Sequence, residues 1–419
     1  MSATPAFAQD AVAELRRELE ALRAEVKELR AEVQTLKAGG EAATAPAVEI
    51  LRTQVAELAQ TKVESTSRFP VKLFGTIHAT AFANSDTANW LDNPNLVGPP
   101  PADGRPGTMS LSLRQTRLGF TADGPTIGSA RTSGVLAMDF FGGVPAFQTG
   151  QAMGLPRLLL AYARIEGERT ALEVGQDHVI LAPRDPTSLA AFAFPLLFRS
   201  GNLYLRAPQV RVERTIAGRV RAAAGVIAPI GGDFTNANYL FVPPALGGER
   251  SRRPGVQARV AYTTEGAGTD AMRSVDVGVS GHVGWERQAT DLATGWATAI
   301  DFAARRDVVG IAGEAFIGDN IDAFGGALGL DARSAGGWAE LQLFPTERLS
   351  FTTGFGLDDI RDNARSTLPR RTNRSAYGNV MFSFTPEVQA SFEYRWLRTL
   401  NLAGPQSNHH VDGVLVYKF

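Results

Sequence analysis

The chain has 419 residues, of which 44% are hydrophobic and 20% are charged, so it can bury a large core and does not have the composition of a disordered protein. Its formal net charge of −1 offers no basic excess for a nucleic-acid partner, and the absence of cysteine excludes disulfides and thiolate metal sites. No apolar run reaches about 18 residues, which excludes helical membrane spans, whereas barrel strands need only about 9 to 11 residues of alternating polarity.

Residues 1–9 resemble the end of a secretory signal, with Ala6-Phe7-Ala8 as the small-residue cleavage site. The charged and apolar regions that precede such a site are missing, and an alanine-rich disordered start is the alternative. A signal remnant predicts an exported protein.

Residues 10–38 carry apolar residues in a strict 3,4 alternation, which predicts a coiled coil of about four heptads. The seam consists of Val12, Leu15, Leu19, Leu22, Val26, Leu29, Val33 and Leu36. One helix cannot bury so narrow a seam, so we expect a homo-oligomer; leucine at d with mostly valine at a favours two strands. An amphipathic helix lying on its own domain is the alternative. Residues 39–70 are expected to form a linker with a short second helix.

Beyond Pro70 the hydrophobic period changes to two, as in residues 275–286 and 388–396. Sixteen strands are predicted at 71–83, 109–121, 131–141, 156–166, 170–177, 208–216, 219–228, 255–264, 273–286, 294–304, 307–317, 334–344, 348–358, 375–384, 388–398 and 410–419. Short turns follow the even strands and long Gly/Pro/Asn-rich loops follow the odd ones. This alternation predicts an all-β fold, a sixteen-stranded antiparallel transmembrane β-barrel over residues 71–419, with both termini and the coiled coil in the periplasm.

The last strand ends on an aromatic residue. Leu415, Tyr417 and Phe419 share one face and are expected to point to lipid. Such an ending resembles the signal read by the barrel assembly machinery, although a soluble β-domain can end this way by chance.

Several short motifs, in this order, resemble those of the DcaP-like trimeric outer-membrane porins. They are RQTRLGF at 114–120, DFFGG at 139–143, VGQ at 174–176, RAPQVR at 206–211, GGW at 336–338, GFG at 354–356 and YKF at 417–419, preceded by the heptads. The resemblance implies a homotrimer of barrels in the outer membrane of a Gram-negative bacterium. It also implies passive diffusion of small solutes with a preference for anions such as carboxylates. Phosphate-selective porins share this plan and are an alternative.

The loop from His178 to Ala207 is expected to form the constriction, because its stretch at residues 189–198 is too apolar for an outside loop. Its charged residues Arg184, Asp185, Arg199 and Arg206 are candidates for the lining. A loop that caps the oligomer from outside is the alternative.

Arginine on inward-facing strand positions is the second candidate for the channel lining. If Val210 and Val212 face lipid, Arg211 faces the lumen, and the same alternation places Arg219, Arg221 and Arg259 inward. Arginine can hold a carboxylate through two hydrogen bonds. The alternative is an internal network of arginines paired with acidic residues. Strand 109–121 changes its apolar parity partway along, which predicts a bulge or an oligomer-facing segment.

No enzyme, cofactor or metal site is expected, because the five histidines do not lie in a metal-binding or hydrolase spacing. His282 beside Ser280 is the least implausible catalytic pair. A structural tether between the outer membrane and the cell wall is a further alternative, because the heptads require a role beyond the pore.

Overall fold

The computed structural model describes Lys27 and residues 70–143, 154–231, 245–264, 273–288 and 290–419. The chain divides into two compact units, Met1–Arg68 and Phe69–Phe419. The predicted signal remnant, the coiled-coil seam and the linker up to residue 69 lie outside the described residues. Among the described residues, no helix has the length and apolar character needed to cross a membrane.

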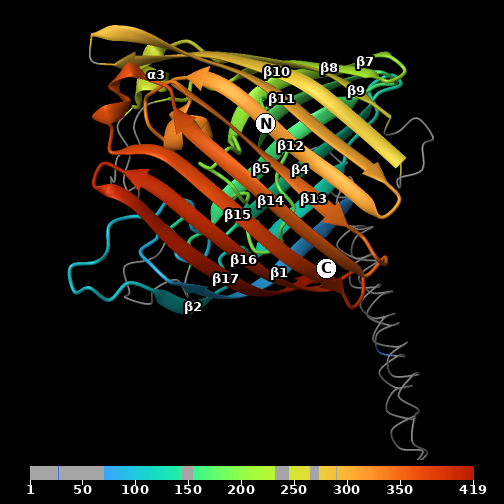
Figure 1. Cartoon of the computed structure of the whole chain (residues 1–419). Coiled ribbons are helices and arrows are strands. Elements are labelled where there is room, and N and C mark those ends of the chain that lie inside the picture. The colour runs from blue at the N-terminus through green and yellow to red at the C-terminus, as the bar shows by residue number, and fades with distance from the viewer. Residues whose placement is uncertain (1–26, 28–69, 144–153, 232–244, 265–272, 289) are drawn as a thin grey trace, which may run out of the picture. The chain divides into compact units, whose positions relative to one another are not determined.

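The second unit is a closed antiparallel β-barrel (Figure 1). Its strand segments are β1 (Val71–Asn84), β2 (Thr108–Ser112), β3 (Arg117–Asp123), β4 (Arg131–Asp139), β5 (Arg157–Glu166), β6 (Thr170–His178), β7 (Arg206–Ala217), β8 (Val220–Ile227), β9 (Gly255–Thr263), β10 (Arg273–Gln288), β11 (Asp291–Arg306), β12 (Val309–Asp319), β13 (Ser334–Leu343), β14 (Leu349–Ile360), β15 (Arg370–Ser383), β16 (Val388–Asn401) and β17 (Gly404–Lys418). Each segment from β3 on pairs with the next, and β17 pairs with β1 to close the ring. In the described loops lie the α-helix α3 (Gly247–Ser251) and the short helical turns η2 (Asp322–Phe324), η3 (Gly326–Leu328) and η4 (Asn363–Ser366).

Segments β2 and β3 together occupy one position in the barrel, so the wall has sixteen strands, as predicted. Both pair with β1, but Thr80 lies opposite Ser112 whereas Thr76 lies opposite Arg117. Residues 77–79 of β1 therefore face residues 113–116, which include one extra residue. Such a bulge moves the side chains after it to the other face. It explains the change of parity that the sequence shows in strand 109–121.

The prediction that every odd strand is followed by a long loop is wrong at two places. β10 and β11 extend to Gln288 and Asp291, and β16 and β17 extend to Asn401 and Gly404, so only two residues separate the strands of each pair. These polar segments were read as loops because they lack an apolar alternation. They are extensions of the strands. The backbone pairing continues there, although apolar and polar residues no longer alternate along the sequence.

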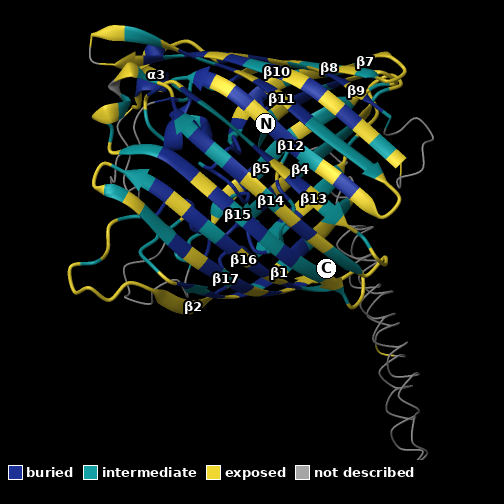
Figure 2. Ribbon diagram, in the orientation of Figure 1, coloured by how far each residue is buried: buried dark blue, intermediate teal, exposed yellow. Residues whose placement is uncertain are grey.

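Exposed and buried positions alternate along the strands (Figure 2). Many of the exposed side chains are large and apolar, and many of the buried ones are polar or charged, so the outer wall is apolar and the inner wall is polar. In β10, Val277 and Val279 are 43% and 51% exposed. Asp276, which lies between the outward Val275 and Val277, is only 9% exposed. Leu415, Tyr417 and Phe419 are also about half exposed, which confirms their predicted outward direction. An outward apolar band with a polar interior is the pattern of a barrel in lipid.

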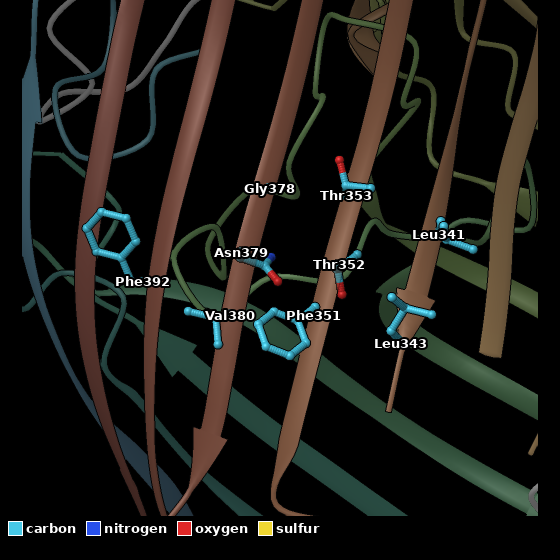
Figure 3. Close-up of a pocket in the computed structure, with 9 residues that line it drawn as sticks. All are labelled: Leu341, Leu343, Phe351, Thr352, Thr353, Gly378, Asn379, Val380 and Phe392. Carbon is cyan, nitrogen blue, oxygen red and sulfur yellow. The ribbon is translucent and has the colours of Figure 1, made fainter. Parts of the chain in front are cut away.

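One depression lies on this outer wall and not in the lumen (Figure 3). It has a volume of about 380 Å³ and is lined mainly by outward side chains of β13 to β16, among them Leu341, Leu343, Phe351 and Phe392. It is therefore separate from the interior surface that could conduct solutes.

The bulge predicts that Leu111 and Phe120 both contact lipid, although their positions differ by an odd number. Because the chain has no cysteine, Leu111→Cys and Phe120→Cys can each carry one fluorescent probe. Lipids with brominated acyl chains should quench both probes strongly, and should quench a probe at the inward Arg221→Cys weakly. Quenching at only one of the first two positions would show a regular strand without the bulge.

Candidate channel constriction

Residues 179–205, called the inner loop below, run inside the barrel. The side chains of Leu181, Ala193 and Leu196 are completely buried, and Leu197 is 1% exposed. The expectation that this loop folds inward is thus confirmed, and the alternative of an outside cap is wrong.

The apolar part of the inner loop packs against the inner wall on the side of β13 to β17. Leu196 and Leu197 lie in one buried cluster with Trp338 and Tyr377, and Ala190 lies in another with Val414 and Val416. Burial of these side chains away from water favours the inward position of the loop.

A glycine in the wall allows the inner loop to approach closely. A Cβ atom at Gly356 would lie 2.1 Å from the Ser200 carbonyl oxygen. Any larger residue would push the loop away from β14, which gives a physical reason for the GFG motif at 354–356.

The bulge between β2 and β3 binds the middle of the inner loop. The Gln115 amide donates to the Ala190 carbonyl at 2.6 Å and accepts from the backbone N–H groups of Phe192 and Ala193 at 2.6 and 2.9 Å. His78 on β1 contacts the Leu189 carbonyl at 2.5 Å. The irregular wall segment is therefore the point at which the loop is attached.

Acidic side chains of β13 and β16 hold the first half of the inner loop. Glu340 accepts from the Thr187 N–H at 2.8 Å and Glu393 accepts from the Ser188 hydroxyl at 2.6 Å. The inner loop is thus bonded to β13 and β16 as well as to β1 and the bulge, which makes it a fixed part of the lumen.

Residues 85–107, called the first loop, also enter the barrel, which the sequence did not predict. Asn93 donates to the Phe194 carbonyl at 2.7 Å, and Asn373 donates to the Asn95 carbonyl at 2.7 Å. Asp92 forms a buried ion pair with Arg114 at 2.5 Å. The sequence signal was weak, because only two short apolar pairs, Trp90-Leu91 and Leu96-Val97, interrupt a largely polar stretch.

Arginines lie over aromatic rings of the inner loop and beside it. Arg117 lies 3.7 Å from the ring centroid of Phe192, Arg157 lies 4.7 Å from that of Phe194, and Arg206 lies 5.1 Å from that of Tyr204. Arg114 lies 4.2 Å above Phe141 in the neighbouring wall. A guanidinium over a ring face keeps its N–H edge available for a hydrogen bond to an anion.

Arg117 and Arg206 form no ion pair within the described residues, and the Nε atom of each is buried without an acceptor. Arg157 differs, because it pairs with Asp139 at 2.7 Å and also donates to the Ala193 carbonyl at 3.0 Å. His178 lies edge-on to Tyr204, with ring centroids 5.6 Å apart. The cluster therefore carries a positive excess from two unpaired guanidinium groups.

Asp185 of the inner loop faces this cluster. Its side chain is solvent-exposed, yet protein surrounds it closely enough that burial raises the pKa of its carboxyl group, and the nearby His178, Arg206 and Arg117 charges oppose that rise. Charged side chains that line a water-filled passage set which ions it favours. Burial likewise raises the pKa of Tyr204 to about 12, so this hydroxyl stays neutral.

Three predicted lining residues belong to internal ion-pair networks. Arg259 pairs with Asp276 at 2.8 Å and Asp301 at 2.6 Å, and Arg184 pairs with the same two carboxylates. Arg211 pairs with Glu173 at 3.1 Å, Asp177 at 2.9 Å and Glu213 at 3.0 Å. The alternative of structural pairing therefore holds for these three, and their charge is offset.

The remaining predicted lining residues, Arg221, Arg219 and Arg199, lie apart from the cluster around Arg206. Arg221 lines a cavity of about 460 Å³ at the end of the barrel where the short turns lie, together with Arg164 and Glu213. The inward position predicted for Arg219 is wrong, because it lies in a turn and donates to the outward Tyr262 hydroxyl at 3.2 Å. Arg199 lies away from the Arg206 cluster, beside Gly329.

Sequence reasoning missed Arg117, Arg157 and His178 as members of this cluster. Arg117 stands in the RQTRLGF segment, which the sequence reading used only for resemblance. Its inward direction depends on the exact position of the bulge at residues 113–116, which the change of parity in strand 109–121 did not fix.

The suggested catalytic pair supports the inner loop. The Ser280 hydroxyl accepts from the Ala182 N–H at 3.2 Å, and His282 contacts the Gln257 amide at 3.3 Å. Both side chains are buried, so neither faces a solute path.

Within the described residues, one acidic group has oxygen atoms close enough to hold a cation. The carboxylates of Glu286, Asp322 and Asp331 lie within 4.8 Å of one another. The Gln288 amide hydrogen-bonds to Glu286 and Asp331.

Comparison with solved structures finds the same barrel fold in outer-membrane channels. The outer membrane channel DcaP of Acinetobacter baumannii has 17% identity and a TM-score of 0.65, over 84% of this chain and 99% of that one. The anion-selective porin from Comamonas acidovorans has 12% identity and a TM-score of 0.56, over 84% and 100%. Salmonella typhi OmpF, in complex with daunomycin, has 11% identity and a TM-score of 0.57, over 84% and 98%.

No family model and no curated protein sequence matches the chain. At these identities the structural likeness shows the fold alone, and it confirms the barrel implied by the resemblance to DcaP-like porins.

Gln115→Ala should loosen the inner loop, because it removes three hydrogen bonds and leaves buried backbone groups unpaired, at a cost of about 1–3 kcal/mol. Single-channel recordings should show noisier current and a higher mean conductance. Gln176→Ala is the matched control, because Gln176 donates to wall carbonyls of Leu158 and Leu159 and not to the loop. Equal noise in both variants would contradict the proposed attachment.

Proposed function

We propose that this protein is an outer-membrane porin, a passive diffusion channel for small solutes that prefers anions such as carboxylates. The observation that carries the proposal is the inner loop, which crosses the lumen and places Asp185 opposite a cluster containing the unpaired Arg117 and Arg206. A diffusion channel forms no covalent bonds, so the size and potential of its narrowest part decide its selectivity.

The electrostatics of the cluster favour anions. Asp139 offsets Arg157, and Asp185 offsets one of the two remaining arginines, so one positive charge is left over even when Asp185 is ionised. Burial raises the pKa of Asp185, so its negative charge is lost at a higher pH than for an ordinary carboxyl. Acidification therefore increases the positive excess.

The guanidinium groups also suit transient binding. Arg206 is held beside the Tyr204 ring, while its planar N–H edge can form two hydrogen bonds to a carboxylate or phosphate. Because the protein supplies few fixed partners there, a passing anion can bind weakly and leave again. Nothing in the cluster distinguishes carboxylate from phosphate, so a phosphate-selective porin remains the alternative.

The orientation and assembly of the channel form part of the proposal. We place the end with the short turns in the periplasm of a Gram-negative bacterium, together with the coiled coil. Phe419 exchanges backbone hydrogen bonds with Gly75 at 2.9 and 3.0 Å where the barrel closes, which supports a role of the last strand in recognition by the assembly machinery.

The seam at residues 10–38 supports a homo-oligomer, for which we propose a trimer. This coiled coil can act as a tether to the cell wall as well as an oligomerisation element.

Arg206→Glu should lower the anion preference or reverse it. A change of about 1 kcal/mol in the interaction of a monovalent ion with the lining, as expected at about 4 Å in water, corresponds to about a fivefold change in permeability ratio. Reversal potentials in a salt gradient across a planar bilayer measure this ratio. Asp185→Asn should shift the ratio in the opposite direction.

Arg374→Glu is the matched control, because this arginine is exposed on the outer wall. Reversal potentials that stay unchanged in both Arg206→Glu and Asp185→Asn would remove the cluster from the selectivity filter. A membrane that shows no conductance with wild-type protein would favour the tether.

Disruption of the seam should separate the subunits. Leu22→Asp with Leu29→Asp places charges at two seam positions, and the mass of the detergent complex should fall relative to wild type. Light scattering with subtraction of the detergent mass checks this, and an unchanged mass would assign oligomerisation to the barrel wall. Glu20→Gln, outside the seam, is the control.

A further inference from the structure

Arg199, near the end of the apolar part of the inner loop, is held in an unusual conformation. Its φ of +62° lies in the left-handed region, which a residue other than glycine adopts only when its surroundings hold it there. The Asn373 amide of β15 supplies this hold, because it donates to the Arg199 carbonyl at 2.9 Å and to the Ser200 hydroxyl at 2.7 Å. Asn373 is itself completely buried.

The side chain of Arg199 is also confined. A Cβ atom at Gly329 would lie 3.0 Å from its Nη2 atom and 3.1 Å from its Cζ atom, and Gly329 has a φ of +72°. On another side, its Cζ atom lies 5.5 Å from the ring centroid of Phe198. The guanidinium is therefore fixed between a backbone turn and an aromatic ring.

Arg370 stands at the start of β15, three positions before the Asn373 that donates to the Arg199 carbonyl, and its charge acts on Arg199. The two positive charges repel each other. The backbone of Arg370 pairs with Asn401, whose side chain donates to the Val97 carbonyl of the first loop at 3.0 Å. The first and inner loops thus meet beside this pair of arginines.

Neither guanidinium forms an ion pair with a carboxylate in the described part of the chain. The Nε atoms of both Arg199 and Arg370 are buried and lack an acceptor. The neighbouring Arg361 and Arg365 differ, because they pair with Asp359 at 3.3 and 2.7 Å. Asp322 is the acidic residue whose charge acts on Arg199.

Both guanidinium groups remain positively charged at neutral pH. Burial lowers the pKa of Arg199, but only to about 10. A charge that is taken out of water without a partner is costly, and a second like charge nearby adds to that cost. An anion that accepted hydrogen bonds from both guanidinium groups would offset the cost of burying their charges and the repulsion between them. Carboxylate and phosphate oxygens match the planar geometry of a guanidinium.

We propose that Arg199 and Arg370 form a second anion-binding site, for the carboxylate or phosphate group of a small soluble solute, at the end of the barrel that carries the long loops. The proposal rests on the proposed porin function, in which a solute binds here before it reaches the Arg206 cluster. Arg199 belongs to a loop inside the wall, and both arginines keep partial exposure to solvent, so the site is open to the lumen and not to the lipid-facing surface.

The test uses the full-length oligomer in bilayers of neutral phospholipid, with acetate or inorganic phosphate as the conducted anion. The wild-type current should saturate as the anion concentration rises. Arg370→Gln should raise the half-saturating concentration about tenfold, as expected for loss of a charge-assisted hydrogen bond. Arg199→Gln should have a similar effect, and Arg370→Lys, which keeps the charge without the planar fork, should lie between wild type and Arg370→Gln.

Arg374→Gln, which removes an outer-wall arginine of the same strand, should leave saturation unchanged. A shift in electrophoretic mobility on heating confirms that each variant is folded, and the sign of the reversal potential should stay that of the wild type. The proposal is overturned if folded Arg370→Gln and Arg199→Gln both saturate as wild type does.

That outcome would leave the porin function standing, because Arg206→Glu tests it separately. Saturation that occurs only when lipopolysaccharide is added would identify a lipid phosphate as the anion and would also overturn the proposal.

Discussion

A hydrocarbon environment offers no hydrogen-bond partners, so each backbone N–H and C=O group of the wall must find one within the protein. The pairing of β17 with β1 meets this requirement by leaving no open edge in the ring. The closed ring then imposes two faces on each strand, of which one meets lipid and the other encloses water. The apolar outer residues and the charged inner ones follow from this single requirement.

The interior is stabilised mainly by polar contacts. Arg184 and Arg259 share Asp276 and Asp301, and these four groups tie the inner loop to β9, β10 and β11. Breaking such a network would leave a buried charge uncompensated, which is more costly than the network is stabilising. Several inner arginines are therefore structural, and the proposed anion preference depends on those that lack a carboxylate partner.

The bulge between β2 and β3 connects the wall to the passage. One extra residue turns Gln115 and Arg117 toward the lumen, where they bind the backbone of the inner loop. The same bulge thus changes which residues face lipid, anchors the inner loop and positions the Arg117 guanidinium, which has no carboxylate partner among the described residues. A local departure from strand geometry that serves a binding role is common near functional sites.

The sequence by itself determined the sixteen strands and predicted the inward position of the loop after His178, because alternation and an apolar loop segment are local properties. It could not tell which of Arg206 and Arg211 keeps its charge uncompensated, since the carboxylates beside Arg211 stand mainly on the neighbouring strand β6. The paired state of Arg211, the outward position of Arg219 and the approach of Arg370 to Arg199 were decided by the tertiary structure alone. Charge compensation depends on distances between residues remote in the chain, and hydrophobic periodicity carries no information about those distances.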